Sequence, residues 1–290
     1  MKHGLAILFL FLLTAFAQAE AIKRETVFWY ISDFPPAYIL TGPSQGQGMG
    51  DRRIQILAKR MPEFRHEIVV APQSRFMEMV KAKSNVCNAG LLKTPERETF
   101  MEFSAVPYGE ALPNGIITTR KRLDLFMPFL NNQGELRLDD FLASGKSRLG
   151  IIASRSFGAG IDAVLKKYAQ RASIVPSSDH LSSRLMKLSN QNEFDAVIAY
   201  PTELLYLTRE LGLDEKEFVF LPVAEEPQLT GAFIACSKSE FGKEVMAAIN
   251  RLLADPVVQR EIAAAYRAWL PKDAGEHFER LRQQLRVMRP

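Results

Sequence analysis

The sequence predicts an α/β protein made of two units, each a mainly parallel sheet flanked by helices, with two crossings between them. Two observations predict this class. Short apolar runs typical of buried strands alternate with amphipathic helical segments, and the loops between them are short. The order strand, helix, strand, helix, strand occurs twice before the chain ends in helices. Such alternation places helices over the faces of mainly parallel sheets.

The first unit is expected to contain extended runs with helices between them. These runs are Val27–Ile31, Glu67–Val70, Ala89–Leu92 and Gly115–Thr119. Asp51 and Ser74 are expected to begin two helices, because short polar side chains accept hydrogen bonds from the first free backbone N–H groups. The inward faces of these helices are Ile54, Leu57, Ala58 and Met61, then Phe76, Met79 and Val80.

The second unit is expected to begin where the chain leaves the first, around Thr118–Leu123. Its predicted strands are Arg148–Ile152, Ser173–Pro176 and Asp195–Ala199. Phe218–Val223 is expected to cross back, and Gly231–Ala235 to be a strand of the first unit, with helices after it. The predicted division is therefore 20–119 and 224–290 for the first unit and 120–223 for the second.

Residues 1–19 have the three parts of a secretory signal peptide. Lys2 supplies the positive charge, Leu5 to Phe16 is an apolar run, and Ala17-Gln18-Ala19 matches a cleavage site. The mature chain is expected to begin near Glu20 and to be a soluble periplasmic protein. The alternative is a membrane anchor, but the run is shorter than a bilayer requires. No later run reaches transmembrane length, so no membrane insertion is expected after cleavage.

The composition is that of an ordinary globular protein, with 47% hydrophobic and 24% charged residues. The net charge of +4 is dispersed, without the basic stripe that nucleic-acid binding requires. The four histidines form no H-x-x-x-H pattern, and the chain has neither a Walker loop nor G-x-G-x-x-G. No nucleic-acid partner, metal or cofactor is predicted. The charge favours, at most, anionic small molecules.

One arginine is placed where it could bind a carboxylate. Arg97 lies in a short turn directly after the apolar run Ala89–Leu92, and Pro95 disfavours helix at Thr94. A guanidinium held on such a turn presents a planar set of donors that matches a carboxylate. The alternative is an ordinary surface arginine that pairs with a neighbouring glutamate.

Five segments carry a family resemblance. They are DFPPAYIL (Asp33–Leu40), TPER (Thr94–Arg97), FSAVPY (Phe103–Tyr108), LGIIASRSFG (Leu149–Gly158) and FDAVIAYP (Phe194–Pro201). In this order and spacing, the chain resembles the type 2 periplasmic solute-binding proteins. Within that group it resembles bacterial solute-binding protein family 3, the branch that serves polar amino-acid import. The resemblance covers nearly the whole mature chain.

The resemblance implies two α/β lobes that close on a ligand held in the cleft between them. Arg97 matches the family arginine that binds the substrate carboxylate. Ser154, Arg155 and Ser156 fall on the loop that completes this site at a helix N-terminus, where N–H groups and the helix dipole favour an anion. Phe34 or Tyr38 would cover the ligand, although core packing is the alternative for both rings. Arg75 is a further expected contact, on a loop that faces the cleft.

Three departures from the family pattern bear on the ligand. Leu92 replaces a hydroxyl residue, and the segment between Ser104 and Pro107 is one residue longer than usual. Tyr200 stands where the family has the aspartate that pairs with the ligand's ammonium group. A tyrosine cannot neutralise an ammonium at neutral pH, so ordinary α-amino acids are expected to bind poorly. Glu203 could take over this role if its side chain faces the cleft.

The resemblance also implies a disulfide. The strands beside Cys87 and Cys236 lie side by side and antiparallel in the family's first lobe, which brings the two cysteines within bonding reach. We therefore expect a Cys87–Cys236 bridge, the alternative being two buried free thiols.

The expected function is the capture of a small carboxylate-bearing solute by a monomer that delivers it to an ABC permease. Two alternatives remain open. One is a periplasmic sensor that docks on a membrane partner, since lobe closure is itself a switch. The other is an enzyme on the same scaffold, similar to cyclohexadienyl dehydratase, in which Glu203 would transfer protons. No paired acid and base supports the enzyme.

Overall fold

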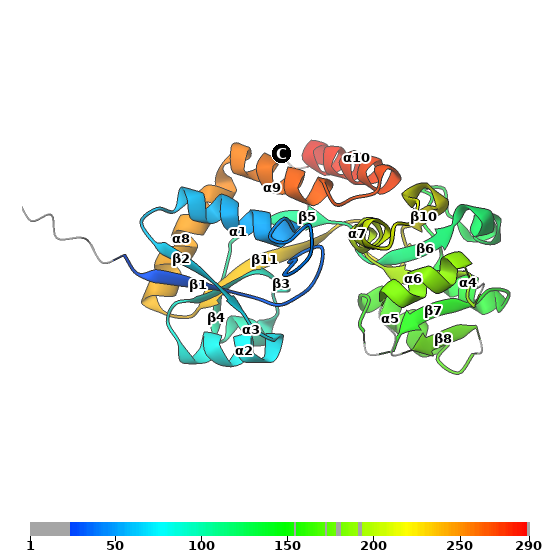
Figure 1. Cartoon of the computed structure of the whole chain (residues 1–290), viewed down its shortest axis with the longest axis horizontal. Coiled ribbons are helices and arrows are strands. Elements are labelled where there is room, and N and C mark those ends of the chain that lie inside the picture. The colour runs from blue at the N-terminus through cyan, green and yellow to red at the C-terminus, as the bar shows by residue number, and fades with distance from the viewer. Residues whose placement is uncertain (1–23, 154, 172, 178–180, 191–192, 289–290) are drawn as a thin grey trace, which may run out of the picture.

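The computed structural model describes residues 24–153, 155–171, 173–177, 181–190 and 193–288. The predicted signal peptide and Ser154 therefore lie outside the described residues. Figure 1 shows two lobes side by side, each built around one sheet, with α9 and α10 along one side of the molecule. The α/β prediction is confirmed. In the described part of the chain, no helix has both the length and the apolar character needed to cross a membrane.

The first lobe contains a sheet of strand order β2-β1-β3-β11-β4, with β5 paired to β11. Its strands are β1 (Thr26–Ile31), β2 (Arg65–Val70), β3 (Val86–Leu91), β4 (Met101–Phe103), β5 (Gly109–Ala111) and β11 (Thr230–Ser237). Its helices are α1 (Met49–Arg60), α2 (Gln73–Ala82), α3 (Pro95–Glu98), α8 (Glu240–Ala254) and α9 (Pro256–Arg267). β1 runs parallel to β2 and β3, whereas β11 is antiparallel to β3.

The first-lobe sheet is covered on both faces, because successive side chains of a strand point to opposite sides. Val27, Trp29 and Ile31 of β1 belong to the core under α1, α8 and α9. Tyr30, between them, belongs to the core under α2. This burial on two faces explains why β1 reads as a nearly continuous apolar run, whereas the residues of the edge strand β2 are exposed or half-buried.

The second lobe contains a sheet of strand order β10-β6-β9-β7-β8. Its strands are β6 (Gly115–Thr119), β7 (Leu149–Ile152), β8 (Ile174–Ser177), β9 (Ala196–Ala199) and β10 (Phe218–Leu221). Its helices are α4 (Leu138–Ser144), α5 (Ala159–Lys167), α6 (Leu181–Asn190) and α7 (Pro201–Leu211). β7 is parallel to β8 and β9, whereas β6 is antiparallel to β9 and β10.

The first crossing lies earlier in the chain than expected, whereas the predicted second boundary, at 223, falls within the return crossing. Gly115–Thr119 was assigned to the first unit, but as β6 it pairs with β9 and β10 of the second sheet. Phe218–Val223 was expected to cross back, and its first four residues are β10 of that sheet. The chain therefore crosses at residues 112–114 and returns at 222–229. All five residues of β6 are buried, and a buried run does not specify which sheet it joins.

The expected disulfide is confirmed. Cys87 of β3 and Cys236 of β11 lie opposite each other in the antiparallel ladder, with Cα atoms 4.0 Å apart and a sulfur–sulfur bond of 2.03 Å. Both strands extend further than expected, so the cysteines lie within them and not beyond their ends. The bridge closes a loop that contains the entire second lobe.

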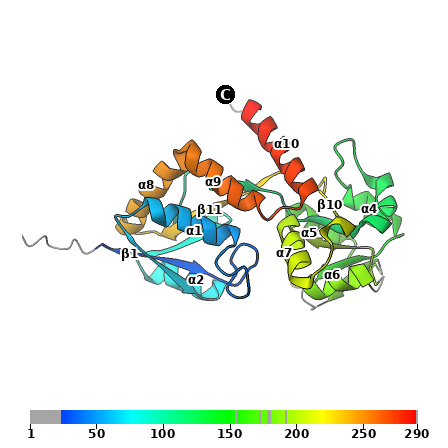
Figure 2. The same ribbon diagram turned by 45° about the horizontal axis from the view of Figure 1, so that its top comes forward.

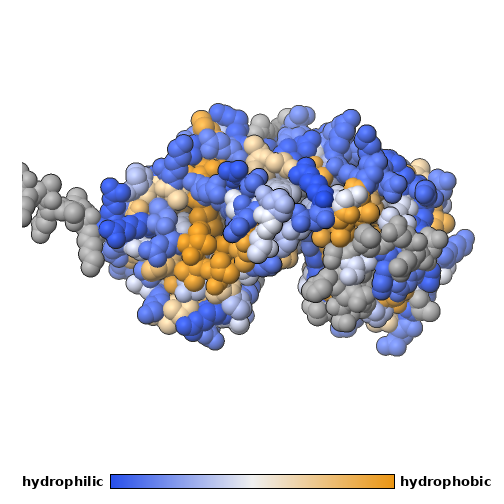
Figure 3. Space-filling model, viewed as in Figure 1, coloured by the Kyte–Doolittle hydropathy of each residue, from blue (hydrophilic) through white to orange (hydrophobic). Residues whose placement is uncertain are grey.

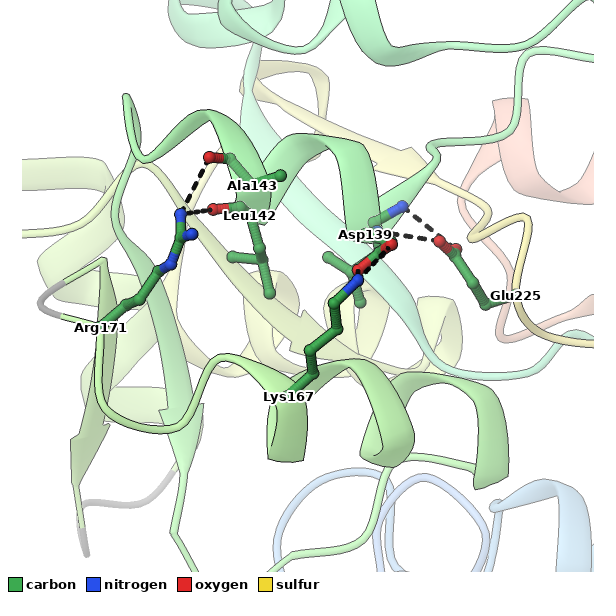
Figure 4. A network of polar contacts seen from close by, with 7 residues as sticks. Asp139, Leu142, Ala143, Lys167, Arg171 and Glu225 are labelled. Atoms are coloured by element: carbon green, nitrogen blue, oxygen red, sulfur yellow. Dashed lines mark hydrogen bonds and ion pairs between the residues drawn. The ribbon is translucent and has the colours of Figure 1, made fainter.

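The return crossing is held to the second lobe by two glutamates. Glu225 accepts hydrogen bonds from the backbone N–H groups of Leu138 and Asp139, at 3.1 and 2.9 Å, and so caps the start of α4 (Figure 4). At the other end of α4, Arg171 donates to two carbonyl groups (Figure 4). Glu226 accepts from the backbone N–H of Ile161 in α5, at 2.8 Å.

The last helix, α10 (Lys272–Met288), was expected to belong to the first lobe, but it contacts both lobes. Arg282 pairs with Glu110 of β5 at 3.3 Å, and Asp273 pairs with Arg120 of the second lobe at 3.2 Å. Phe278 packs in a small core that also contains Leu112, at the first crossing. Figure 2 shows α10 rising over the junction between the lobes.

Candidate ligand-binding site between the lobes

A pocket of about 230 Å³ lies between the two lobes. The first lobe contributes Phe34, Tyr38, Arg53, Gly90 and Tyr108 to its lining, and the second contributes Tyr200, Thr202 and Glu203. Figure 3 shows the hollow between the lobes on the side away from α9 and α10. A larger hollow, of about 600 Å³, lies beside Asn250 and Arg282. It is lined by none of the predicted site residues, so the interlobe pocket is the better candidate.

The two predicted aromatic residues differ in exposure. A pair of backbone hydrogen bonds between Phe34 and Tyr38 closes the loop that follows β1. Phe34 is 45% exposed at the pocket, whereas Tyr38 is only 7% exposed and packs in the first-lobe core. The Tyr38 ring lies over Gly50, where a Cβ atom would come within 2.5 Å of it. Phe34 can therefore cover a ligand, whereas the ring of Tyr38 is a buried part of the pocket wall.

Arg53 is a pocket residue that the sequence analysis missed. It is 5% exposed on the inward face of α1, and its guanidinium donates to the carbonyl oxygen of Ala89. The guanidinium carbon lies 3.2 Å from the centre of the Tyr108 ring. Its Nε has no hydrogen-bond partner. The available signal was its spacing, because Arg53 lies one turn before Leu57 on the apolar face of the helix.

Three polar groups converge on the floor of the pocket beside Gly90. A Cβ atom at Gly90 would lie 3.7 Å from Nη1 of Arg53, 3.8 Å from the Tyr38 hydroxyl and 3.9 Å from the Tyr108 hydroxyl. The Tyr38 hydroxyl also has no hydrogen-bond partner. Burial raises the pKa of Tyr38, and the positive charge of Arg53 only partly offsets this. Its hydroxyl is therefore protonated at neutral pH and can donate a hydrogen bond.

The second-lobe side of the pocket contains a buried ion pair. Arg155 donates to both carboxylate oxygens of Glu203, at 2.8 and 2.7 Å, and to the side-chain oxygen of Asn114 at 3.2 Å. The exposed fractions of the two charged side chains are only 17% and 9%. Burial acts to lower the pKa of Arg155, but the hydrogen bonds and charge of Glu203 outweigh it and raise the pKa. Glu203 lines the pocket, yet its charge is already balanced.

Tyr200 is the residue directly before α7. Its backbone N–H donates to the Glu203 carboxylate at 2.9 Å, which satisfies one of the free groups at the start of this helix. The Arg155 guanidinium lies 5.4 Å from the centre of the Tyr200 ring. Burial raises the pKa of Tyr200. The residue therefore offers the pocket a neutral hydroxyl group and a ring.

The remaining predicted residues do not line the pocket. Arg97 donates to the carbonyl of Leu92, a pocket residue, at 2.7 Å. Arg75 lies within α2 and not on a loop, and its exposed side chain pairs with that of Glu78 at 3.0 Å. Ser156 donates to Asp162 at 2.5 Å.

Helix α5 begins next to two carboxylates of the chain itself. Asp162 accepts from the Ser156 hydroxyl and from the backbone N–H of Phe157, and Glu226 accepts from the N–H of Ile161. A ligand carboxylate at Ser156 or Arg155 would therefore compete with carboxylates that are already bound there. The predicted role of this loop stays a prediction.

Comparisons with known proteins identify the fold. No family model matches the chain, and no curated protein matches its sequence. Solved structures do match it. The probable amino-acid ABC transporter extracellular-binding protein ytmK of Bacillus subtilis has a TM-score of 0.63 and 16% identity, over 87% of this chain and 100% of that one.

Two further structures are similar over most of both chains. Substrate-binding domain 2 of GlnP from Lactococcus lactis, in an open conformation, has a TM-score of 0.60 and 17% identity, over 86% of this chain and 96% of its own. The periplasmic VFT2 domain of BvgS from Bordetella pertussis has a TM-score of 0.55 and 17% identity, over 84% of this chain and 93% of its own. The chain therefore has the two-lobe fold that its sequence predicts.

Proposed function

We propose that this chain is a periplasmic solute-binding protein that captures a small carboxylate-bearing molecule between its lobes. The observation that carries the proposal is the interlobe pocket, which takes its lining from both lobes. Ligand sites commonly lie at such domain junctions. A volume of about 230 Å³ suits a ligand of amino-acid size. Delivery to an ABC permease is supported by the similarity to ytmK, a probable amino-acid ABC transporter extracellular-binding protein, and to a substrate-binding domain of GlnP.

The pocket favours an organic acid over an α-amino acid. Tyr200 replaces the family aspartate, and Glu203 is the one acidic side chain among the described lining residues. Because Glu203 is bound by Arg155 and by the Tyr200 N–H, it has little capacity left for an ammonium group. A buried ammonium without a counter-charge is costly. The same pairing argues against the enzyme, which would need Glu203 free to exchange a proton.

The test is calorimetry with matched pairs of compounds: phenylalanine and phenylpyruvate, leucine and its α-keto acid, and glutamate and 2-oxoglutarate. We expect a keto acid to bind more tightly than its amino acid, and to raise the melting temperature because it binds only the folded state. The NMR spectrum of the compound recovered after binding should show that it is chemically unchanged. Clear preference for an amino acid that persists in Glu203→Gln would overturn the organic-acid assignment. Chemical conversion of a bound compound would show instead that the protein is an enzyme.

A further inference from the structure

We infer that the ligand's anionic group is held in the first lobe by Arg53, together with the hydroxyls of Tyr38 and Tyr108. This inference rests on the proposed function and assigns the binding group within the same pocket. It differs from the predicted assignment, in which Arg97 and the loop around Ser156 bind the carboxylate.

The first argument is the charge of Arg53. An arginine this deeply buried is normally paired with an acid, because an uncompensated buried charge is costly. None of the ion pairs among the described residues involves Arg53. The Ala89 carbonyl and the Tyr108 ring stabilise the guanidinium only in part. An anion entering the pocket would supply the missing counter-charge.

The second argument is the set of unsatisfied donors. Four buried side-chain polar atoms of the described residues lack a hydrogen-bond partner, and two of them are Arg53 Nε and the Tyr38 hydroxyl. Buried polar groups are satisfied in most native structures. Both of these residues line the interlobe pocket, next to Gly90. Gly90 leaves room where the donors converge, since no side chain fills that point.

The third argument is the opposite electrostatic character of the second lobe. The charge of Arg155 in this lobe is already neutralised by Glu203. The backbone N–H groups at the start of α5 already bind Asp162 and Glu226. A ligand carboxylate directed at these carboxylates would be repelled. The same carboxylate directed at Arg53 meets a guanidinium that has no acidic partner among the described residues. The ligand's charge should therefore point into the first lobe.

The rest of the pocket indicates the chemical class of the ligand. Phe34, Met49, Leu112, Tyr200 and Tyr266 supply apolar or aromatic lining around the polar floor. The ligand class that fits is a small organic acid with an apolar or aromatic remainder. Lobe closure would then cover the remainder, while Arg53 retains the carboxylate.

The test uses 3-phenylpropanoate, phenylpyruvate and benzoate, each paired with its uncharged amide, and measures affinity by calorimetry. We expect at least one acid to bind and its amide to bind at least tenfold more weakly. Arg53→Gln should weaken the acid at least tenfold and leave the amide unchanged. The matched control is Arg52→Gln on the same helix, since the exposed Arg52 side chain is hydrogen-bonded only to Gln55. It should leave both affinities unchanged.

Two milder variants keep the test decisive if Arg53→Gln does not fold. Tyr38→Phe removes one hydroxyl and keeps the ring packing, so a several-fold loss of acid affinity is expected. Gly90→Ala meets no atom closer than 3.7 Å, so it should fold. Its methyl group would occupy the space beside the three donors and weaken the acid more strongly than the amide.

Failure of the Arg53 assignment and failure of the proposed function would give different results. Acids that bind no better than their amides, or that bind Arg53→Gln as tightly as the native protein, overturn the Arg53 assignment and leave a solute-binding protein. If Arg97→Gln loses acid binding and Arg53→Gln retains it, Arg97 binds the ligand carboxylate, as the sequence analysis predicts. If none of these acids or amides binds, and none of the amino and keto acids above binds, the proposed function itself fails.

Discussion

Buried Arg53 and largely buried Arg155 have opposite electrostatic surroundings. Arg155 lies against both oxygens of Glu203, whereas Arg53 faces two tyrosine hydroxyls and a carbonyl group. The distinction predicts different responses to substitution. Removing one member of a buried pair leaves the other without a counter-charge, whereas removing an isolated buried charge also removes its desolvation cost.

Glu203→Gln should therefore destabilise the second lobe. We expect the free energy of unfolding in urea to fall by about 3 kcal/mol, because Arg155 remains buried without its partner. The double variant Arg155→Met/Glu203→Gln should recover much of this loss. The control is Glu78→Gln, which breaks the exposed pair with Arg75 and should cost less than about 1 kcal/mol. Equal effects of the two single variants would contradict the buried-pair argument.

Arg53→Met, unlike Glu203→Gln, should not destabilise the ligand-free protein. Methionine fills a similar apolar volume, and its lack of charge removes the desolvation cost that Arg53 carries. We expect the free energy of unfolding in urea to stay within about 1 kcal/mol of the native value or to rise. Acid binding should be lost. A loss of about 3 kcal/mol or more would identify Arg53 as a structural residue.

At the scale of elements, the return crossing packs closely on α5. Ile161 donates to Glu226, and a Cβ atom at Gly160 would overlap the backbone carbonyl group of Glu225. Backbone atoms of two segments are in contact at this point, so neither can move without the other. This contact sets the position of the crossing against the second lobe.

Gly160→Ala should therefore destabilise the protein, although alanine is the better helix former. We expect a loss of about 2 kcal/mol, because overpacking against backbone outweighs the propensity gain. Gly275→Ala in α10 is the matched control. Its methyl group would meet only the flexible end of Arg267, so a gain of up to about 1 kcal/mol is expected. Urea unfolding measures both, and stabilisation by Gly160→Ala would contradict the packing argument.

Helix α10 should make stability depend on pH through His277. Burial, followed by the positive charge of Arg280, lowers the pKa of His277 below 6.5. Above pH 6.5 both the folded and the unfolded protein hold a neutral imidazole. As the pH falls below that value, the unfolded chain takes up the proton first, so stability is lost until the folded pKa is passed.

The measurement compares urea midpoints at pH 7.5 and pH 5 for the native protein and His277→Gln. The native protein should lose more stability on acidification than the variant. Identical losses would show that burial of His277 does not contribute to the pH dependence.

At the scale of the whole molecule, the disulfide closes a loop around the second lobe. Cys87 and Cys236 are 149 residues apart in the chain. Loss of this loop constraint in Cys87→Ala/Cys236→Ala should lower the free energy of unfolding by up to about 5 kcal/mol, on chain-entropy grounds. Guanidinium unfolding measures the change, and ligand affinity at 20 °C should be retained. A change below about 1 kcal/mol would show that the bridge contributes little.

Local patterns in the chain were enough to predict the α/β class and most strands. Val27–Ile31 and Asp195–Ala199 contain buried strands because continuous apolar runs of that length favour strands covered on both faces. The disulfide followed from a resemblance that placed β3 beside β11. Phe34, Tyr38, Tyr200 and Glu203 were also identified this way, and all four line the pocket.

Long-range contacts decided what those patterns could not. β6 is as apolar as a first-lobe strand, and only its pairing with β9 and β10 shows which sheet it joins. Arg155 and Glu203 are 48 positions apart, so no local pattern reveals that they neutralise each other. Only the fold shows that Arg53 is buried and that its guanidinium donates to the distant Ala89 carbonyl. Charge balance depends on neighbours in space, and those neighbours come from distant parts of the chain.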